Sequence, residues 1–359
     1  MKKFLPMQIM RVFLCLGFEC NLNCPYCIQG ESKPKERGQK TGINPDIYPF
    51  IKGLLKNLPP KKHLRIIFFG GEPLLYLDKI KTITKKLKNK RILFQIITNG
   101  KLLDEENIKF FNRYNFGVQI SWDGSISATT RGYNALKDKI SLINKIKNAS
   151  LSAVLNSKLR LKHLVLQMQG IDNYYFKNTG RRIQNNIATL NDTSGDFRFS
   201  KDFNFEVLRQ DFAAFIDDFF IKKLYPSFTN FFKTMLDCAN FFYVQNNGNY
   251  IGSLPYCGEG FHALSLSIDG SILRCHNSAV KTGTIYEPFW TYLNRALGQM
   301  IICKKTDCSV YGMCRGGCKL QKEAQLIEGS YCLFQKALYE PMIEFIGKIG
   351  DSKEEIICC

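Results

Sequence analysis

Three cysteines, Cys20, Cys24 and Cys27, lie within eight residues, directly after the first apolar run of the chain. Zinc sites and most iron–sulfur clusters take four protein ligands. A loop that offers three thiolates leaves one iron of a [4Fe–4S] cluster open to a ligand from outside the protein. The spacing therefore predicts a metal centre with an open coordination position. Half of a zinc site, or a buried group of thiols, is the alternative.

The cysteine content bears on where the protein works. The chain has 14 cysteines, and Met1 to Met10 lacks the apolar core and cleavage site of an export signal. No apolar run is long enough to span a membrane, and Ile356 to Cys359 is not a prenylation box. We therefore expect a cytoplasmic protein without a membrane partner, whose cysteines hold metal rather than form disulfides. Three are exceptions, since we expect Cys15 to be a buried strand thiol, and Cys358 and Cys359 to end the chain as a tail.

The size and charge of the chain limit its possible partners. The chain of 359 residues is 45% hydrophobic with 28 phenylalanines, enough for one large domain and one or two smaller ones. Its formal charge of +19 favours an acidic peptide or a nucleic acid. Many lysines, however, lie at helical spacing, as in Lys79 to Lys88, where they form a solvated face. No RNA-reading or DNA-reading motif accompanies the charge, so we do not expect a nucleic-acid partner.

Short apolar runs alternate with helical patterns in the first half of the chain, which predicts parallel strands joined by helices in an α/β fold of barrel type. The expected strands are Ile9–Leu16, Leu64–Phe69, Ile92–Ile97, Gly117–Ser121, Leu151–Leu155 and Tyr174–Lys177, and the expected helices are Asp46–Leu58, Leu77–Asn89, Asp104–Tyr114 and Asn134–Ile146. A helical face at Leu161, Leu164, Val165 and Met168, a long loop at Asn178–Asp202, and helices at Asn204–Lys222 and Pro226–Tyr243 follow.

The cysteine spacing, with Tyr26 before the last cysteine, resembles the signature of the radical S-adenosylmethionine (SAM) superfamily. The resemblance implies a partial (β/α)6 barrel and a [4Fe–4S] cluster whose open iron is chelated by the amino and carboxylate groups of SAM. It further implies reductive cleavage of SAM to a 5′-deoxyadenosyl radical, with Tyr26 covering the adenine. Barrels of this type place their chemistry at the carboxyl ends of the strands.

Three strand ends carry segments that resemble others in this superfamily. Gly70-Gly71-Glu72-Pro73 follows the second strand, where glycines allow close backbone approach, and the resemblance assigns Gly70, Gly71 and Glu72 to the amino group of SAM. Thr98-Asn99-Gly100 follows the third strand. Ser121-Trp122-Asp123-Gly124 follows the fourth, and Ser121 is the candidate for the ribose side of SAM. A plain turn is the alternative for the Gly-Gly-Glu segment.

Arg131 lies after the fourth strand, where relatives have an arginine near the SAM carboxylate. A guanidinium suits a carboxylate because it can donate two parallel hydrogen bonds. Arg131 is therefore the carboxylate candidate, with a surface arginine as the alternative.

Seven further cysteines resemble the SPASM domain, which in its relatives binds two auxiliary [4Fe–4S] clusters, and the segment from Leu266 to Cys275 resembles the β-hairpin that opens that domain. The resemblance implies that Cys257, Cys275 and Cys318 serve the first auxiliary cluster, with Cys238 as a candidate fourth ligand, and that Cys303, Cys308, Cys314 and Cys332 serve the second. Four-thiolate zinc sites are the alternative.

The chain departs from the pattern of relatives in three places. Cys303 and Cys308 are separated by four residues where two is usual. No additional peptide-binding domain precedes the cysteine loop, so we expect any leader peptide to be bound elsewhere or by a separate protein. Relatives that oxidise a sulfatase residue to formylglycine have an aspartate base after the second SPASM cysteine, where this chain has His276. A histidine can also accept a proton near neutral pH, so His276 is the candidate catalytic base, or else a surface side chain beside a cluster.

These expectations combine into one hypothesis. The domains are a radical SAM barrel at residues 1–202, a helical bridge at 203–250, a SPASM domain at 251–345 and a tail at 346–359. The function is that of a peptide maturase, an oxidoreductase that abstracts hydrogen from a residue of a ribosomally made peptide to form a thioether or carbon–carbon crosslink. Formylglycine formation on a sulfatase is the first alternative, and a non-catalytic metal-binding interaction protein is the second. The expected partners are a peptide or protein substrate and a reductant such as flavodoxin or ferredoxin.

Overall fold

A computed structural model of the chain describes residues 9–29, 42–190, 202–236, 262–288, 308–314, 317–318, 320 and 329–352. The chain forms two compact units. The first comprises Met1–Ser121, Arg131–Ala149 and Cys257–Met300, and the second comprises Trp122–Thr130, Ser150–Tyr256 and Ile301–Cys359.

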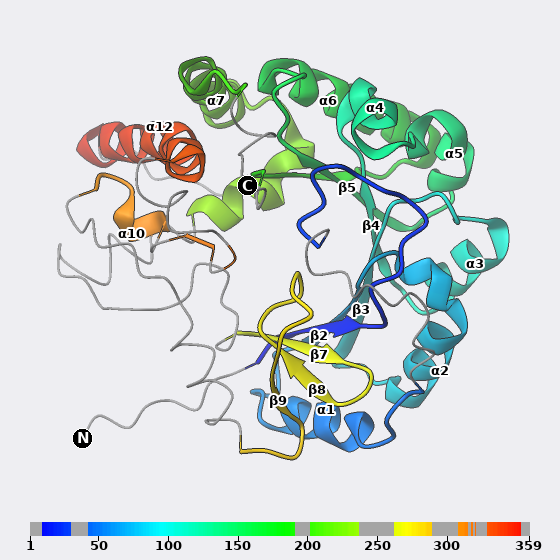
Figure 1. The fold of residues 1–359 in the computed structure, drawn as a ribbon. Helices are drawn as coiled ribbons and strands as arrows, with labels where there is room; N and C mark the ends of the chain where they lie inside the picture. The colour runs from blue at the N-terminus through cyan, green and yellow to red at the C-terminus, as the bar shows by residue number, and fades with distance from the viewer. Residues whose placement is uncertain are drawn as a thin grey trace, which may run out of the picture. The chain divides into compact units, whose positions relative to one another are not determined.

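The first unit is built on a mostly parallel sheet whose strands lie in the order β4, β3, β2, β1, β7, β8, β9 (Figure 1). Strands β1 to β4 are parallel, β7 pairs parallel with β1, and β8 and β9 continue antiparallel. The strands are β1 Arg11–Cys15, β2 Leu64–Phe69, β3 Ile92–Thr98, β4 Gly117–Ser121, β7 Ala263–Ser267, β8 Ser271–Leu273 and β9 Lys281–Thr284.

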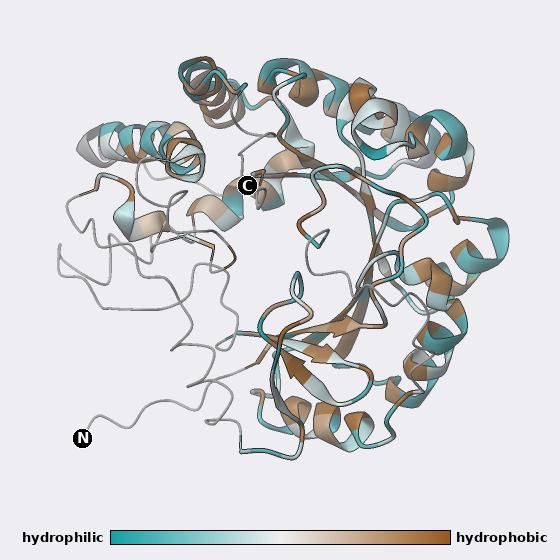
Figure 2. Cartoon of the chain, viewed as in Figure 1, coloured by the Kyte–Doolittle hydropathy of each residue, from teal (hydrophilic) through white to brown (hydrophobic). Residues whose placement is uncertain are grey.

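Helices connect the parallel strands and cover one face of this sheet (Figure 1). They are α1 Ile47–Lys56, α2 Leu77–Leu87, α3 Glu105–Arg113 and α5 Ala135–Ile143, with a short 3-10 helix η1 at Pro73–Tyr76. Figure 2 shows hydrophilic residues along the outer sides of these helices and hydrophobic residues along the strands. The pattern is that of amphipathic helices that pack an apolar stripe against a sheet.

The two faces of the sheet differ in burial because successive side chains of a strand point to opposite sides. The helix-covered face is fully buried, as at Val12, Ile66 and Phe68. The other face carries half-buried residues such as Phe13 and Gln95. Both are paired with Ile67 in the strand register, so the three residues lie in one row across β1, β2 and β3. This second face is the side on which the parallel strands can present polar groups to a ligand.

The second unit contains the remaining two parallel strands and a helical, phenylalanine-rich region. Strands β5 Asn148–Val154 and β6 Gln184–Ala188 pair in parallel. The other elements are η2 Gly124–Ile126, α4 Ser127–Arg131, α6 Leu161–Thr179, α7 Phe205–Phe220, η3 Pro226–Phe228, α10 Tyr311–Cys314 and α12 Ser330–Ser352. Phe212, Phe215 and Phe232 form a buried cluster within this unit, and Phe220 stacks on Phe345 to join α7 to α12.

The predicted α/β fold with a partial (β/α)6 barrel is confirmed, and the described residues include the six parallel barrel strands, β1 to β4 in the first unit and β5 and β6 in the second. The predicted hairpin is also confirmed, with Gly270 at a φ of +91° in its turn. The domain boundaries at residues 202, 250 and 345 remain predictions.

The predicted sixth strand at Tyr174–Lys177 is wrong. These residues belong to α6, because Leu161, Leu164, Val165, Met168 and Tyr175 continue one buried helical face. Gly180 ends the helix in the left-handed conformation with a φ of +68°, which glycine adopts without strain. The sixth strand is β6, inside the stretch predicted to be a long loop; residues 191–201 of that loop lie outside the described residues.

The second helix of the predicted bridge is described only in part. It begins with η3 and continues as helix to residue 236, and its predicted end at Tyr243 lies outside the described residues. Within the described part of the chain, no helix is both long and apolar enough to cross a membrane.

Removal of the Phe68 ring should destabilise the first unit. Phe68 is fully buried and its ring centroid lies 6.2 Å from that of Phe94 and 5.8 Å from that of Phe116. We expect Phe68→Ala to lower the free energy of unfolding by about 3–5 kcal/mol, measured by urea denaturation. The control Leu93→Ala, whose side chain is 36% exposed, should cost less than about 1 kcal/mol. Equal losses in the two variants would contradict the assignment of the buried face.

Candidate active site

The cysteine loop leaves the carboxyl end of β1 and is bound to the segment that follows β2. The backbone N–H of Gly71 donates to the carbonyl of Gly17 at 3.1 Å, and that of Glu72 donates to the carbonyl of Glu19 at 2.8 Å. Glu19 immediately precedes Cys20. The first cysteine is therefore fixed relative to the end of β2 by two backbone hydrogen bonds.

Two glycines make this contact possible. A Cβ atom on Gly70 would lie 2.1 Å from the carbonyl oxygen of Gly17, and one on Gly71 would lie 2.1 Å from the carbonyl oxygen of Glu19. Gly70 also has a φ of +146°, in the region that favours glycine. The close approach that the sequence predicted at these positions therefore includes an approach to the backbone of the cysteine loop. Their predicted contact with the amino group of SAM stays a prediction.

Glu72 is a buried carboxylate that joins two strand ends. Its Oε1 accepts hydrogen bonds from Leu74 N at 3.0 Å and Thr98 Oγ1 at 2.7 Å, and its Oε2 accepts one from Asn99 N at 2.8 Å. Burial raises the pKa of Glu72, and the hydrogen bonds from Asn99, Leu74 and Thr98 oppose that rise. Each carboxylate oxygen already has a protein donor, so Glu72 braces the loops whatever else it binds.

The three loop cysteines are half-buried. The sulfur of Cys20 accepts hydrogen bonds from Leu22 N at 3.4 Å and Asn99 Nδ2 at 3.9 Å. The sulfur of Cys24 lies 3.7 Å from the carbonyl oxygen of Arg131, and Cys27 N donates to the carbonyl of Cys24 at 3.1 Å. Among the residues that the structure describes, no three His, Cys, Asp or Glu side chains are gathered closely enough to bind one metal ion. Thiolates of a [4Fe–4S] cluster bind separate irons, so they need not converge on one point.

The structure places two of the SAM candidates beside the loop. The guanidinium of Arg131 lies 5.6 Å from the ring centroid of Tyr26, and the backbone of Arg131 contacts Cys24. Ser121 ends β4 and is half-buried, and no hydrogen bond of its side chain is present in the described part of the chain. Arg131 and Tyr26 thus share a location with the cysteines, whereas Ser121 is placed only by its position at the strand end.

His276 lies on the half-buried face of the sheet. Its ring stacks on Phe13 with centroids 4.1 Å apart and meets the ring of Phe69 edge-on at 5.1 Å. The buried side chain of Gln29, two residues after Cys27, donates to the backbone carbonyl of His276 at 3.3 Å. The hairpin therefore carries His276 to the strands from which the cysteine loop and the Gly-Gly-Glu segment emerge.

The cysteines of the predicted auxiliary clusters are divided between the two units. Cys275 belongs to the first unit and is buried at the end of the hairpin. Cys308, Cys314, Cys318 and Cys332 belong to the second unit, where Cys318 N donates to the hydroxyl of Tyr331 at 3.1 Å. Cys257, Cys303 and the spare Cys238 lie outside the described residues. The assignment of these cysteines to the two auxiliary clusters stays a prediction.

Sequence reasoning missed three residues that organise the loop, namely Asn21, Gln29 and Asn99. Asn99 Nδ2 donates to Asn21 Oδ1 at 2.7 Å in addition to its contact with Cys20. The available signal was the Thr98-Asn99-Gly100 segment, which was singled out without a role for the asparagine. Gln29 carried no signal, because a glutamine after a cysteine motif has no characteristic spacing.

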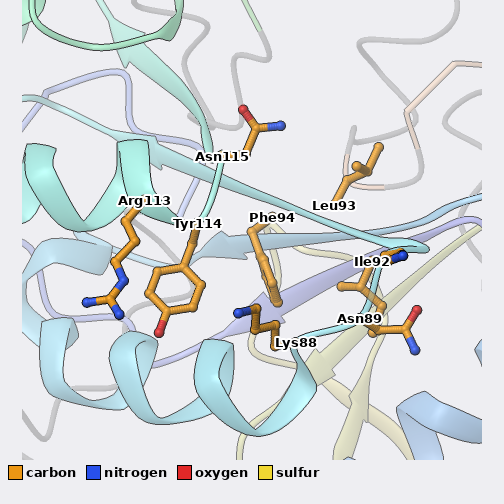
Figure 3. A pocket seen from close by; sticks show the side chains of 9 residues that line it. Lys88, Asn89, Ile92, Leu93, Phe94, Arg113, Tyr114 and Asn115 are labelled. Atoms are coloured by element: carbon orange, nitrogen blue, oxygen red, sulfur yellow. The ribbon is translucent and has the colours of Figure 1, made fainter.

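A separate pocket of about 440 Å³ lies at the other end of the sheet (Figure 3). Its lining includes Ile92 and Phe94 at the start of β3 and three cationic residues, Lys88, Lys90 and Arg113. At about 3.3 Å per residue, β3 separates it from Asn99 by roughly 20 Å. The pocket is therefore not part of the cysteine site.

Comparison with known proteins finds similarity to one enzyme superfamily. Residues 15–152 match the model of the radical SAM superfamily. The chain is 30% identical over 168 residues to the radical SAM cyclopropyl synthase TigE of Paramaledivibacter caminithermalis, covering 42% of this chain and 36% of the synthase. It is 24% identical to a cysteine-type anaerobic sulfatase-maturating enzyme of Clostridium novyi, over 90% of this chain and 92% of that protein.

The solved structures agree with the fold. That of native anSMEcpe with bound AdoMet superposes with a TM-score of 0.66 at 18% identity, covering 96% of this chain and 100% of that one. Residues 15–152 thus match the radical SAM superfamily, and the similarity to a sulfatase-maturating enzyme over 90% of the chain fits the SPASM subgroup. Enzymes of this class use a [4Fe–4S] cluster and SAM, and the SPASM type adds auxiliary clusters. The residues fit such a cofactor, since three half-buried thiols lie in one loop and one of their sulfurs already accepts two hydrogen bonds.

We expect the Gly71 contact to be required for cluster retention. A Cβ on Gly71 would push Glu19, and with it Cys20, away from the end of β2. Gly71→Ala should lose most of the iron and sulfide that the anaerobically reconstituted wild type retains after desalting. The control Gly117→Ala places its Cβ at an ordinary 3.6 Å from Gln95, and it should retain the wild-type content. Full retention in Gly71→Ala would contradict the steric argument.

Cys15 should be the least reactive of the thiols near the site. It is 3% exposed, as the sequence predicted for a buried strand thiol. Burial raises its pKa to about 12, with a smaller contribution from the charge of Asp269. At pH 8 about one molecule in ten thousand then carries the thiolate that reacts with iodoacetamide. In metal-free native protein, peptide mass spectrometry should find Cys24 alkylated and Cys15 unmodified, whereas both react in guanidinium. Alkylation of Cys15 at the rate of Cys24 would show that this burial is wrong.

Proposed function

We propose that the protein generates a 5′-deoxyadenosyl radical and uses it to abstract a hydrogen atom from a residue of a peptide or protein. The observation that carries the proposal is the three-cysteine loop, held at the carboxyl end of parallel strands by the Gly-Gly-Glu segment. A parallel α/β barrel presents reacting groups at that end of its strands.

In this proposal Cys20, Cys24 and Cys27 hold the cluster at three of its irons. When bound, the cluster and SAM supply one electron and a carbon radical through cleavage of the sulfonium. Gly70, Gly71 and Glu72 orient the amino group of SAM and Arg131 its carboxylate, while Tyr26 covers the adenine and Ser121 lies on the ribose side. The guanidinium of Arg131 lies over the ring of Tyr26, which supports the proposal that these two residues contact the same ligand.

Crosslinking is a two-electron oxidation of the substrate. Abstraction of one hydrogen atom leaves a substrate radical, and formation of a thioether or carbon–carbon bond then releases one proton and one electron. We assign this proton to His276, whose ring stacks on Phe13 and meets Phe69 edge-on at the half-buried face of the sheet. Auxiliary clusters would supply an acceptor for that electron, and the residues that would hold them are Cys257, Cys275, Cys303, Cys308, Cys314, Cys318 and Cys332.

Two observations bear on which oxidation occurs. His276 replaces the aspartate expected of formylglycine-forming relatives, and the match to the cyclopropyl synthase supports bond formation. We therefore favour a crosslink in a ribosomally made peptide. Formylglycine formation on a sulfatase is the second candidate, and it is supported by the similarity to cysteine-type maturases over 90% of the chain.

The same proposal names the protein's partners. Reductive cleavage of SAM needs a low-potential electron donor, for which a cytoplasmic flavodoxin or ferredoxin is suitable. The third proposed partner is a separate protein that binds the leader of the peptide substrate.

Cleavage of SAM tests the enzyme assignment. Reconstituted wild-type protein should hold about twelve irons if all three clusters are present. After reduction it should convert SAM to 5′-deoxyadenosine, and Cys24→Ala should fall to the rate seen without protein. A chain that takes up zinc and cleaves no SAM would instead be the non-catalytic metal-binding protein.

Mass spectrometry of co-expressed substrates separates the two oxidations. Loss of two hydrogens from a peptide encoded beside this chain indicates a crosslink, whereas loss of sulfur and two hydrogens with gain of one oxygen at a sulfatase cysteine indicates formylglycine.

A further inference from the structure

The side chain of Asn99, at the end of β3, reaches the first cysteine of the loop. Its amide nitrogen lies 3.9 Å from the sulfur of Cys20 and 2.7 Å from Oδ1 of Asn21. We propose that Asn99 tunes the reduction potential of the SAM-binding cluster by donating a hydrogen bond to the Cys20 thiolate. The inference rests on the proposed role of Cys20 as a cluster ligand.

The orientation of the Asn99 amide follows from its own hydrogen bonds. Oδ1 accepts from the backbone N–H of Lys101 at 2.9 Å, so the amide oxygen is turned into the β3 turn. The NH2 group must then face the cysteine loop, where one hydrogen is available for Asn21 and one for Cys20. The hydrogen bonds, rather than the shape of the side chain, therefore determine which terminal atom of Asn99 is oxygen and which is nitrogen.

The backbone of Asn99 is fixed as well. Its N–H donates to Oε2 of Glu72 at 2.8 Å, and Glu72 is 1% exposed. Glu72 is itself tied through its N–H to Glu19, the residue before Cys20. Donor and acceptor are thus both tied to Glu72, the donor through its buried carboxylate and the acceptor through its backbone N–H, so packed groups set their separation.

The Cys20 sulfur receives a second hydrogen bond, from Leu22 N at 3.4 Å. By contrast, the sulfur of Cys24 faces a carbonyl oxygen, that of Arg131. Hydrogen bonds to the sulfurs stabilise the more negative, reduced state of a cluster and so raise its potential. The two hydrogen bonds make Cys20 a ligand through which this chain eases entry of an electron.

The test is a redox titration of the reconstituted protein, followed by electron paramagnetic resonance. The SAM-binding cluster is identified as the one whose reduced spectrum changes when SAM is added. We expect Asn99→Ala to shift its midpoint potential to more negative values, with iron content and the response to SAM retained. Asn99→Asp keeps the turn with Lys101 but replaces the donor by a carboxylate, so it should shift the potential further in the same direction.

Asn21→Ala is the matched control, because it removes the acceptor of the loop brace and leaves the donor to Cys20 in place. Its potential should equal that of the wild type. A wild-type potential in Asn99→Ala, or an equal shift in Asn21→Ala, would overturn the proposal. If Asn99→Ala fails to hold the cluster, Asn99→Asp carries the comparison alone. A wild-type protein without any SAM-dependent spectrum would instead count against the proposed function.

Discussion

The site depends on one buried carboxylate. Glu72 follows β2, accepts hydrogen bonds from the end of β3 and from its own turn, and donates its N–H to the residue before Cys20. A carboxylate without these partners would cost several kcal/mol to bury. The same bonds that make its burial tolerable therefore fix the ends of β2 and β3 relative to each other, and the backbone N–H of Glu72 adds the loop that follows β1. The glycines before it complete the arrangement, since any side chain there would occupy the position of the loop backbone.

The sheet supports this arrangement through its two unlike faces. The helix-covered face is continuous apolar core, which holds the strands in register. The opposite face carries half-buried groups, among them Phe13 and Phe69, that clamp His276. A single sheet thus supplies the rigid support and the surface on which chemistry can take place. The basic pocket at the amino ends of β3 and β4 belongs to neither role.

The barrel strands were predictable because each is a short apolar run between turn signals, and β2 and β4 have the predicted bounds. The error at Tyr174–Lys177 has a physical origin, since Tyr and Phe favour strands in isolation while burial of Tyr175 on the face of α6 decides for helix. The hairpin was predictable from Asp269 and Gly270. Its parallel pairing with β1 was not, because nothing local to Leu264 or Leu266 specifies a partner so distant in the chain.

Residues of the candidate site were predictable where they belong to a sequence motif, and not where only a contact in the folded chain identifies them. The cysteines and Gly-Gly-Glu were evident from spacing, whereas the link from Asn99 to Cys20 depends on how two strand ends meet.

The pairing of β1 with β7 has a consequence for biosynthesis. Arg11 pairs with Ala263, about 250 residues later, so one edge of β1 stays uncovered for roughly 10 to 50 seconds at 5 to 20 residues per second. An exposed strand edge invites association with other chains, so the nascent polypeptide needs protection until its hairpin emerges from the ribosome.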